Sequence, residues 1–335
     1  MTWIPFLNGV YGQDQASAIY VADHIKRGKF TLYKDIYAQP IGQLIPIYFL
    51  QFLFKRENTK AFFWVMCLYC SFSSFVLFWV IFSLFGLMAA IIGSMVFSLY
   101  IVSPRLDGNW GAVEQLLSLP LISSLFCMLI SSHPSSYSLS CTLILLSGIL
   151  FGYAVLVKQT AVIYLPGFIL MLIDTTYPIT SNLLFLTGVL FANLIPLFYF
   201  WLRHNAFWEY LTCMWLHSIP FAINPKKYNK HYPRFQVQGT KDNSIRKRII
   251  YENSRSLYPL LFLSMIGIVS LSIYHFSFLY FGLFVCLLAS IWTIVMRKTL
   301  FPHYWLNMVP WLAIFVGFGL TEIIIDLSRD EIPSA

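Results

Sequence analysis

Nine long apolar stretches recur along this 335-residue chain, and they constrain its fold more than any other feature. A helix needs about 20 apolar residues to cross the hydrocarbon core of a bilayer, within a range of about 17–25. Stretches that meet or approach this length lie at 61–83, 84–102, 111–131, 139–157, 160–174, 182–202, 257–274, 276–296 and 304–326. We therefore expect an all-α integral membrane protein with about nine spanning helices.

The composition leads to the same class of protein. Only 11% of the residues are charged, whereas a soluble domain carries roughly 25%. The chain contains 31 Phe, 20 Tyr and 10 Trp, and aromatic residues suit lipid contacts and membrane interfaces. A soluble globule, a disordered tail and a disulfide-stapled secreted domain are excluded. We expect a multi-pass protein of the cell (inner) membrane, with the endoplasmic reticulum membrane as the alternative.

The N-terminal residues 1–60 differ from the rest, because they hold shorter amphipathic patterns. Apolar residues recur at helical spacing within 13–28, and Gly28 stands where such a helix would end. The next apolar stretch, 41–54, has only 14 residues and is interrupted by polar residues such as Gln43. It is too short to span, so we expect an interfacial or re-entrant helix there.

Nine spans sort the loops onto two faces, and the charges divide between these faces very unevenly. One face, called the basic face from here on, comprises 1–60, 103–110, 158–159, 203–256 and 297–303. It holds 21 of the 22 Lys and Arg residues but, with Glu114 at its boundary counted, only nine of the 14 Asp and Glu residues. The positive-inside rule would make this face cytoplasmic. Alternatively, the cations serve an anionic phosphate substrate, and the face lies outside.

Four segments place acids, lysines or histidines beside Gly or Pro at the boundaries of apolar stretches. They are 12–40, with Asp14, Gly28, Lys34, Asp35 and Pro40; 103–114, with Pro104, Asp107 and Glu114; 148–160, with Gly148, Gly152, Ala154, Leu156, Lys158 and Thr160; and 301–310, with Pro302, His303, Tyr304 and Pro310. In this order they resemble the GT-C glycosyltransferases, in particular the branch of protein O-mannosyltransferases and the lipid A aminoarabinose transferase. The resemblance extends over about 10–312. Family members begin with a spanning helix before the Asp loop, and here only a remnant precedes Asp14.

The resemblance implies a GT-C-like multi-span bundle in four parts. These parts are an extracytoplasmic loop with amphipathic juxtamembrane helices at 1–60, a transmembrane core at 61–202, an outer aromatic and basic loop at 203–256, and C-terminal spans with a short tail at 257–335. It also implies that the basic face is extracytoplasmic, against the positive-inside assignment.

The activity that the resemblance implies is that of a membrane glycosyltransferase. Such an enzyme moves a hexosyl or pentosyl unit from a polyprenyl-phosphate donor to a hydroxyl of a protein, lipid or glycan, usually with inversion. The expected partners are this donor, the acceptor and membrane lipids; no nucleic-acid-binding fold accompanies the basic residues. Since no His, Cys or carboxylates show metal-ligand spacing, we expect no cofactor and leave a divalent metal open.

The catalytic candidates are acids at the basic face. The resemblance assigns Asp14 as the general base that deprotonates the acceptor hydroxyl, a role that suits a positioned carboxylate. Glu114 is the second acid, and Asp107 in the same loop is an alternative for its role. For Asp14 and Glu114 the structural alternative is a charge that stabilises a helix N-terminus.

The substrate-binding candidates are mostly cations, because negative charge grows on the departing lipid phosphate. They are Lys34, Asp35, Asp107, Lys158, Arg203, His303 and Tyr304. The alternative for Lys158 and Arg203 is snorkelling to the membrane interface. For Lys34 it is a solvated loop charge, and for His303 a neutral imidazole at the interface.

Two other functions compete with glycosyl transfer. A transporter or flippase of a lipid-linked anion would hold ionisable residues inside its spans and show internal repeats. The stretches 61–102, 139–157, 182–202 and 257–296 contain no Asp, Glu, Lys or Arg, and no repeat is visible. An O-antigen polymerase or ligase would share basic outer loops such as 203–256, and would depend on arginines there.

Overall fold

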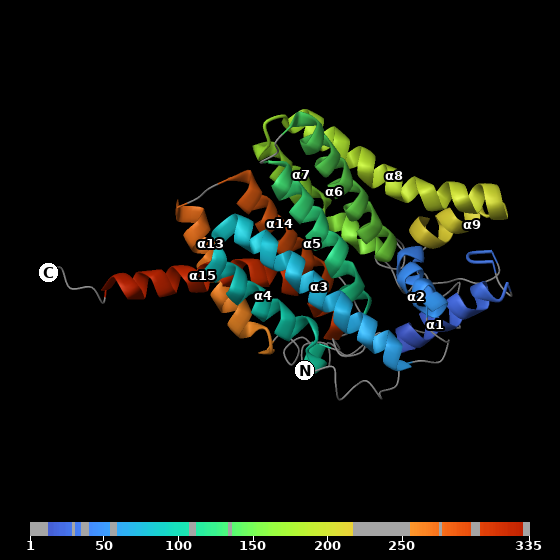
Figure 1. Cartoon of the computed structure of the whole chain (residues 1–335), viewed down its shortest axis with the longest axis horizontal. Coiled ribbons are helices and arrows are strands. Elements are labelled where there is room, and N and C mark those ends of the chain that lie inside the picture. The colour runs from blue at the N-terminus through green and yellow to red at the C-terminus, as the bar shows by residue number, and fades with distance from the viewer. Residues whose placement is uncertain are drawn as a thin grey trace.

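The computed structural model is a bundle of helices. It describes residues 13–28, 31–34, 40–53, 59–106, 112–132, 136–216, 255–274, 277–295 and 302–330. Each element that these residues form is helical, and Figure 1 shows the long helices running side by side through the molecule. The expectation of an all-α bundle is confirmed for this part of the chain.

All nine predicted apolar stretches fall on helical segments. These are α3 (Thr59–Phe85), α4 (Leu87–Ile101), α5 (Val113–Ser131), α6 (Tyr137–Val157), the series η4 (Gln159–Tyr164), α7 (Leu165–Met171) and η5 (Leu172–Asp174), then α8 (Pro178–His204), α13 (Tyr258–Tyr274), α14 (Phe278–Val295), and η7 (Pro302–Met308) followed by α15 (Val309–Asp330). Among the described residues, six segments are long and apolar enough to cross a membrane. Leu87–Ile101, Gln159–Asp174 and Tyr258–Ile273 are shorter apolar helices. The protein is a multi-pass membrane protein.

The core of the bundle lies around α15, which packs against α4 and α13. In the most apolar part of the span that contains α15, 72% of the residues are buried. The corresponding value for α8, which forms an edge of the bundle (Figure 1), is only 28%. Glycines allow the backbones to approach closely, as is common where membrane helices meet. A Cβ on Gly148 of α6 would lie 2.1 Å from the carbonyl oxygen of Phe185 on α8, so nothing larger than Gly fits there.

Two short helices, α1 (Gln13–Lys26) and α2 (Ile41–Leu53), lie next to each other beside the bundle (Figure 1). The predicted end of the first helix is confirmed, because Gly28 adopts a φ of +66°, which L side chains rarely adopt. The second covers the predicted 41–54 stretch and packs on α1 and on α6. Their placement relative to a membrane stays a prediction.

One predicted span is broken rather than continuous. Between residues 159 and 174 the chain forms 3₁₀ turns on both sides of the seven-residue helix α7. Pro166 stands in the first turn of α7, where a missing N–H costs no helical hydrogen bond. The break begins at Lys158, whose extended backbone (φ −155°, ψ 116°) separates α6 from η4. The side chain of Lys158 therefore projects from a corner between two helices.

Candidate active site

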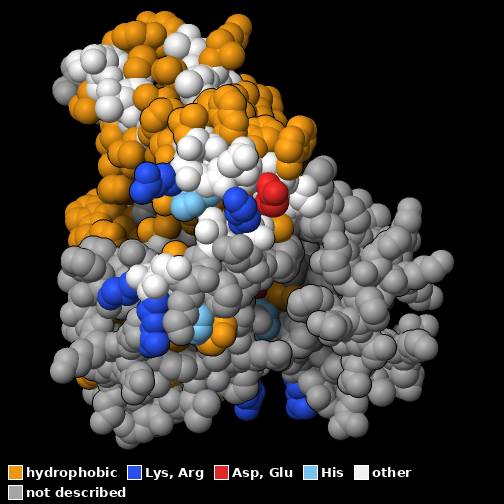
Figure 2. Space-filling model, turned by 90° about the vertical axis from the view of Figure 1, so that its right-hand side faces the viewer, with side chains coloured by type: hydrophobic (Ala, Val, Ile, Leu, Met, Phe, Trp, Pro, Cys, Tyr) orange, Lys and Arg blue, Asp and Glu red, His pale blue; other side chains and the backbone are white. Residues whose placement is uncertain are grey.

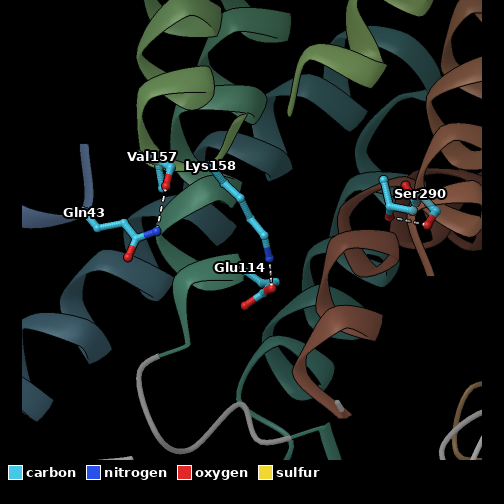
Figure 3. A network of polar contacts seen from close by, with 6 residues as sticks. Gln43, Glu114, Val157, Lys158 and Ser290 are labelled. Carbon is cyan, nitrogen blue, oxygen red and sulfur yellow. Dashed lines mark hydrogen bonds and ion pairs between the residues drawn. The ribbon is translucent and has the colours of Figure 1, made fainter. Parts of the chain in front are cut away.

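Four of the predicted site residues meet where α5 begins, α6 ends and η7 passes. Glu114 lies in the first turn of α5, and its Oε1 forms an ion pair with Lys158 Nζ (Figure 3). Lys158 Nζ also lies 4.8 Å from the centroid of the Tyr304 ring, in range of a cation–π interaction. The His303 ring packs edge-on against Tyr304, with centroids 4.7 Å apart, and lies within electrostatic range of Glu114.

This group is removed from water, although its two central residues are charged. The side chain of Lys158 is 12% exposed and that of Glu114 only 1%. Glu114 Oε2 is also buried and has no hydrogen-bond partner among the described residues. A buried oxygen without a donor is costly, so this carboxylate is able to accept a hydrogen bond from a ligand. The Lys158 ammonium is therefore held inside the protein by Glu114 and does not snorkel to the membrane interface.

The backbone around Lys158 is fixed by hydrogen bonds on both sides of the corner. Its N–H donates to the Ala154 carbonyl at 3.0 Å, and its own carbonyl accepts from the Ala161 N–H at 2.8 Å. The preceding carbonyl, that of Val157, accepts from Gln43 Nε2 on α2 at 2.9 Å (Figure 3). The carbonyls at a helix C-terminus have no partner within the helix, and here a side chain from another helix supplies one.

A second group of predicted residues lies at the end of α8. Lys34 Nζ donates to the His204 carbonyl at 3.5 Å, next to Arg203, and both the Lys34 and Arg203 side chains are exposed. Figure 2 looks onto this end of the molecule and shows Lys, Arg and His side chains on the surface, next to acidic atoms and below an apolar region in this view. The structure thus places Lys34 and Arg203 together, and Lys158 in a separate, buried group.

Aromatic packing holds the second group in place. The Tyr33 ring packs edge-on against Phe200 of α8 and against Tyr210 of α9 (Phe207–Leu211), with centroids 5.0 and 5.3 Å away. Burial raises the pKa of the Tyr210 hydroxyl well above its ordinary value, so Tyr210 stays neutral. This cluster orders residues 31–34 against the end of α8.

Two hydrogen bonds to Met214 connect these groups. Met214, in the π-helical turn Thr212–Leu216, accepts hydrogen bonds at its Sδ from Tyr33 Oη (3.4 Å) and from Gln159 Nε2 (3.5 Å). Nothing in the local sequence marks Met214. Gln43 did carry a signal, because it interrupts an apolar stretch, but its partner on α6 is 114 residues away.

Three predicted acids are not placed by the structure. Asp14 lies in the first turn of α1, but its side chain is outside the described part, as are Asp35 and Asp107 entirely. Their relation to Glu114 stays a prediction. Within the described residues, no three or more His, Cys, Asp or Glu side chains form a group that could hold a metal ion.

The fold is similar to that of known membrane enzymes. ArnT from Cupriavidus metallidurans in the apo state superposes with a TM-score of 0.64 at 14% identity, over 96% of this chain and 57% of that one. The same protein bound to undecaprenyl phosphate gives 0.62 at 13%, over 98% and 61%. The oligosaccharyltransferase of Archaeoglobus fulgidus, tethered with an acceptor peptide, gives 0.63 at 10%, over 96% and 46%.

These similarities establish the fold. The predicted GT-C-like multi-span bundle is confirmed as a fold, because the chain shares its helical arrangement with ArnT and with the oligosaccharyltransferase. The chain spans about half the length of the structures that it matches. No protein-family model matches the sequence, and no curated protein does.

Proposed function

We propose that this protein is a membrane glycosyltransferase that moves a sugar from a polyprenyl-phosphate donor to an acceptor hydroxyl on the extracytoplasmic face. The observation that carries the proposal is the buried Lys158–Glu114 pair at the basic end of a GT-C-like bundle. Among the similar structures, one ArnT holds undecaprenyl phosphate, and an oligosaccharyltransferase holds dolichol-phosphate with an inhibitory peptide. Lipid phosphates are therefore ligands of proteins with this fold.

A stabilising role explains the pair poorly. Removing two charges from water costs several kcal/mol per ion, and apolar residues of similar volume often stabilise a protein as well or better. A buried lysine at a helix end is, by contrast, suited to bind a phosphate by a charge-assisted hydrogen bond. We assign Lys158 to the donor phosphate, with the Tyr304 ring beside its ammonium group.

The reaction requires a base, an electrophile and a stabilised leaving group. Asp14 takes the proton of the acceptor hydroxyl, and that oxygen attacks the anomeric carbon from the side opposite the phosphate. The bond between the anomeric carbon and the phosphate oxygen breaks, its electron pair leaves with the lipid phosphate, and the configuration inverts. Lys158 and His303 stabilise the charge on this phosphate, and Glu114 holds Lys158 and orients the acceptor.

The remaining predicted residues act at the entrance. Lys34 and Arg203 are exposed cations on the same end of the molecule, and they attract the anionic headgroup toward the site. Asp35 and Asp107 are assigned to contacts with the sugar or the acceptor there, and Tyr304, beside Lys158 inside the site, is assigned to the same contacts.

The decisive experiment is sugar transfer in proteoliposomes that contain the full chain and a panel of radiolabelled polyprenyl-phosphate sugars. We expect release of the lipid phosphate together with labelled acceptor. Asp14→Asn should slow transfer by about 10²–10⁴-fold, because a positioned base is lost, and should leave binding of undecaprenyl phosphate unchanged. Asp23→Asn is the matched control, since Asp23 lies on the same helix and pairs with Arg27 at 3.0 Å. Lipid translocation without any sugar transfer would instead establish a flippase.

The face of the reaction is tested by cysteine labelling. In a background without the six native cysteines, Asn229→Cys in the long basic loop should react with a membrane-impermeant maleimide in intact cells. Thr176→Cys, an exposed position at the opposite end of the spans, is the control and should react only after lysis. The reverse pattern would place the basic face in the cytoplasm and contradict the proposal.

A further inference from the structure

Gln43 is buried in a way that apolar packing does not require. It lies on α2, is 5% exposed, and donates from Nε2 to the Val157 carbonyl at 2.9 Å. Its other polar atom, Oε1, is buried and has no partner among the described residues. Burying an amide with one half unpaired is costly, so a leucine would serve packing alone at lower cost.

The hydrogen bond from Gln43 belongs to a three-part contact between α2 and the last turn of α6. Gly42 lies so close that a Cβ there would be 2.4 Å from the Leu156 carbonyl carbon and from the Val157 nitrogen. Tyr153 Oη on α6 donates to the Gly42 carbonyl at 3.0 Å. We call this contact, formed by Gly42, Gln43, Tyr153 and Val157, the α2–α6 clamp.

The clamp acts on the peptide unit that carries Lys158. The oxygen of the Val157–Lys158 peptide is held by Gln43, and its N–H is held by the Ala154 carbonyl at 3.0 Å. With both polar groups fixed, this planar unit cannot rotate, and rotation of the unit would swing the Lys158 side chain away from Glu114 and Tyr304. Figure 3 shows Gln43 and Glu114 on either side of Val157 and Lys158.

We infer that Gln43 is a positioning residue, which fixes Lys158 for the donor phosphate by holding the Val157 carbonyl and so couples α2 to phosphate binding. This inference rests on the proposed function, because it takes Lys158 as a ligand of the phosphate. It makes α2 part of the binding machinery, without any contact between Gln43 and the substrate.

A double-mutant cycle tests the inference, with undecaprenyl phosphate as the probe and the full chain in nanodiscs. Gln43→Leu removes the donor and keeps the size, and it should weaken binding about three- to tenfold, the range for one lost hydrogen bond of about 1 kcal/mol. In a Lys158→Met background the same change should have no further effect, because the residue through which Gln43 acts is gone. Asn193→Leu is the matched control. The Asn193 amide on α8 donates to the Gly152 carbonyl of α6 at 3.3 Å, so it too contacts α6, but at a residue six positions before Lys158.

Tyr153→Phe supplies a milder variant in case Gln43→Leu fails to fold, because it removes only the hydroxyl that donates to Gly42. It should weaken binding in the same direction and by a smaller factor, again only when Lys158 is present. Equal loss of affinity in both backgrounds, or none in either, would show that the clamp is merely structural and overturn the inference. If wild-type and Lys158→Met proteins bind the lipid equally, the assignment of Lys158 fails, and the inference fails with it.

Discussion

The two cationic groups of the candidate site, one around Lys158 and one formed by Lys34 and Arg203, differ in their access to water. Lys158 is 12% exposed, pairs with a carboxylate that is 1% exposed, and lies over an aromatic ring. Lys34 and Arg203 are exposed, and Lys34 donates to a backbone carbonyl at 3.5 Å. Electrostatic interactions strengthen when water is excluded, whereas exposed charges are screened by water and salt. Cations of equal charge are therefore expected to contribute very unequally to binding.

The largest effect is expected from Lys158→Met. It leaves the Glu114 carboxylate buried without its partner, a change that typically costs about 3–5 kcal/mol of stability. It should also raise the apparent KM for the polyprenyl-phosphate donor at least about tenfold, because a charge-assisted hydrogen bond is lost, and the defect should persist at high salt. Unfolding in SDS measures the stability, and initial rates over a donor series measure KM.

A second substitution separates stability from binding in the buried group. Adding Glu114→Leu to Lys158→Met removes both charges and should restore most of the free energy of unfolding. The donor KM should stay high in the double variant, because no cation remains for the phosphate. A double variant that regains wild-type KM would mean that the pair is structural, and the comparison between the two groups would lose its functional meaning.

Tyr304→Leu should have an intermediate effect. The ring contributes about 0.5–2 kcal/mol to holding the Lys158 ammonium, so its loss should raise the donor KM roughly two- to thirtyfold. As for Lys158→Met, this rise in KM should persist at high salt. Tyr304→Phe keeps the ring and is the control. If Phe is as severe as Leu, the hydroxyl carries the effect and the cation–π contact does not.

The smallest effect is expected in the exposed group. Lys34→Ala or Arg203→Ala should weaken attraction to the anionic headgroup by about 1 kcal/mol at low salt. This corresponds to a rise in the donor KM of about fivefold at most, and it should shrink as ionic strength increases. Donor KM measured at two salt concentrations for both variants checks this. A severe, salt-independent defect in Arg203→Ala would instead place the phosphate site at the end of α8.

Sequence reasoning was most successful where the membrane or the backbone imposes a rule. The nine apolar stretches all fall on helices, because a bilayer requires internally bonded backbone. The end of α1 at Gly28 follows from a conformation that glycine favours. The break at 159–174 was less visible, since a proline in the first turn of a short helix is compatible with both a break and a kinked span.

The candidate site could be named from the sequence but not assembled from it. Glu114 and Lys158 were both predicted, yet nothing local shows that residues 44 positions apart form a pair. The separation of Lys158 from Arg203 depends on which helix ends are buried, and that is decided by packing. Gln43 illustrates the same limit, because the role inferred for it depends on its hydrogen bond to the Val157 carbonyl of α6, which the sequence does not reveal.

The unequal lengths of the helices have a consequence for the lipid around the protein. Helix α4 has 15 residues and rises about 22 Å, short of a hydrocarbon core of about 30 Å, whereas the 27 residues of α8 rise about 40 Å. A bilayer meets a short helix such as α4 by thinning, by snorkelling of flanking residues or by association of helices, and it meets a long helix such as α8 by tilt, a kink or local thickening. The carbonyl at the end of α4, that of Ile101, accepts from Gln115, the neighbour of Glu114. If the bilayer thins beside α4, its headgroups lie closer to the Lys158 group, and sugar transfer is then expected to slow as the acyl chains of the host membrane lengthen.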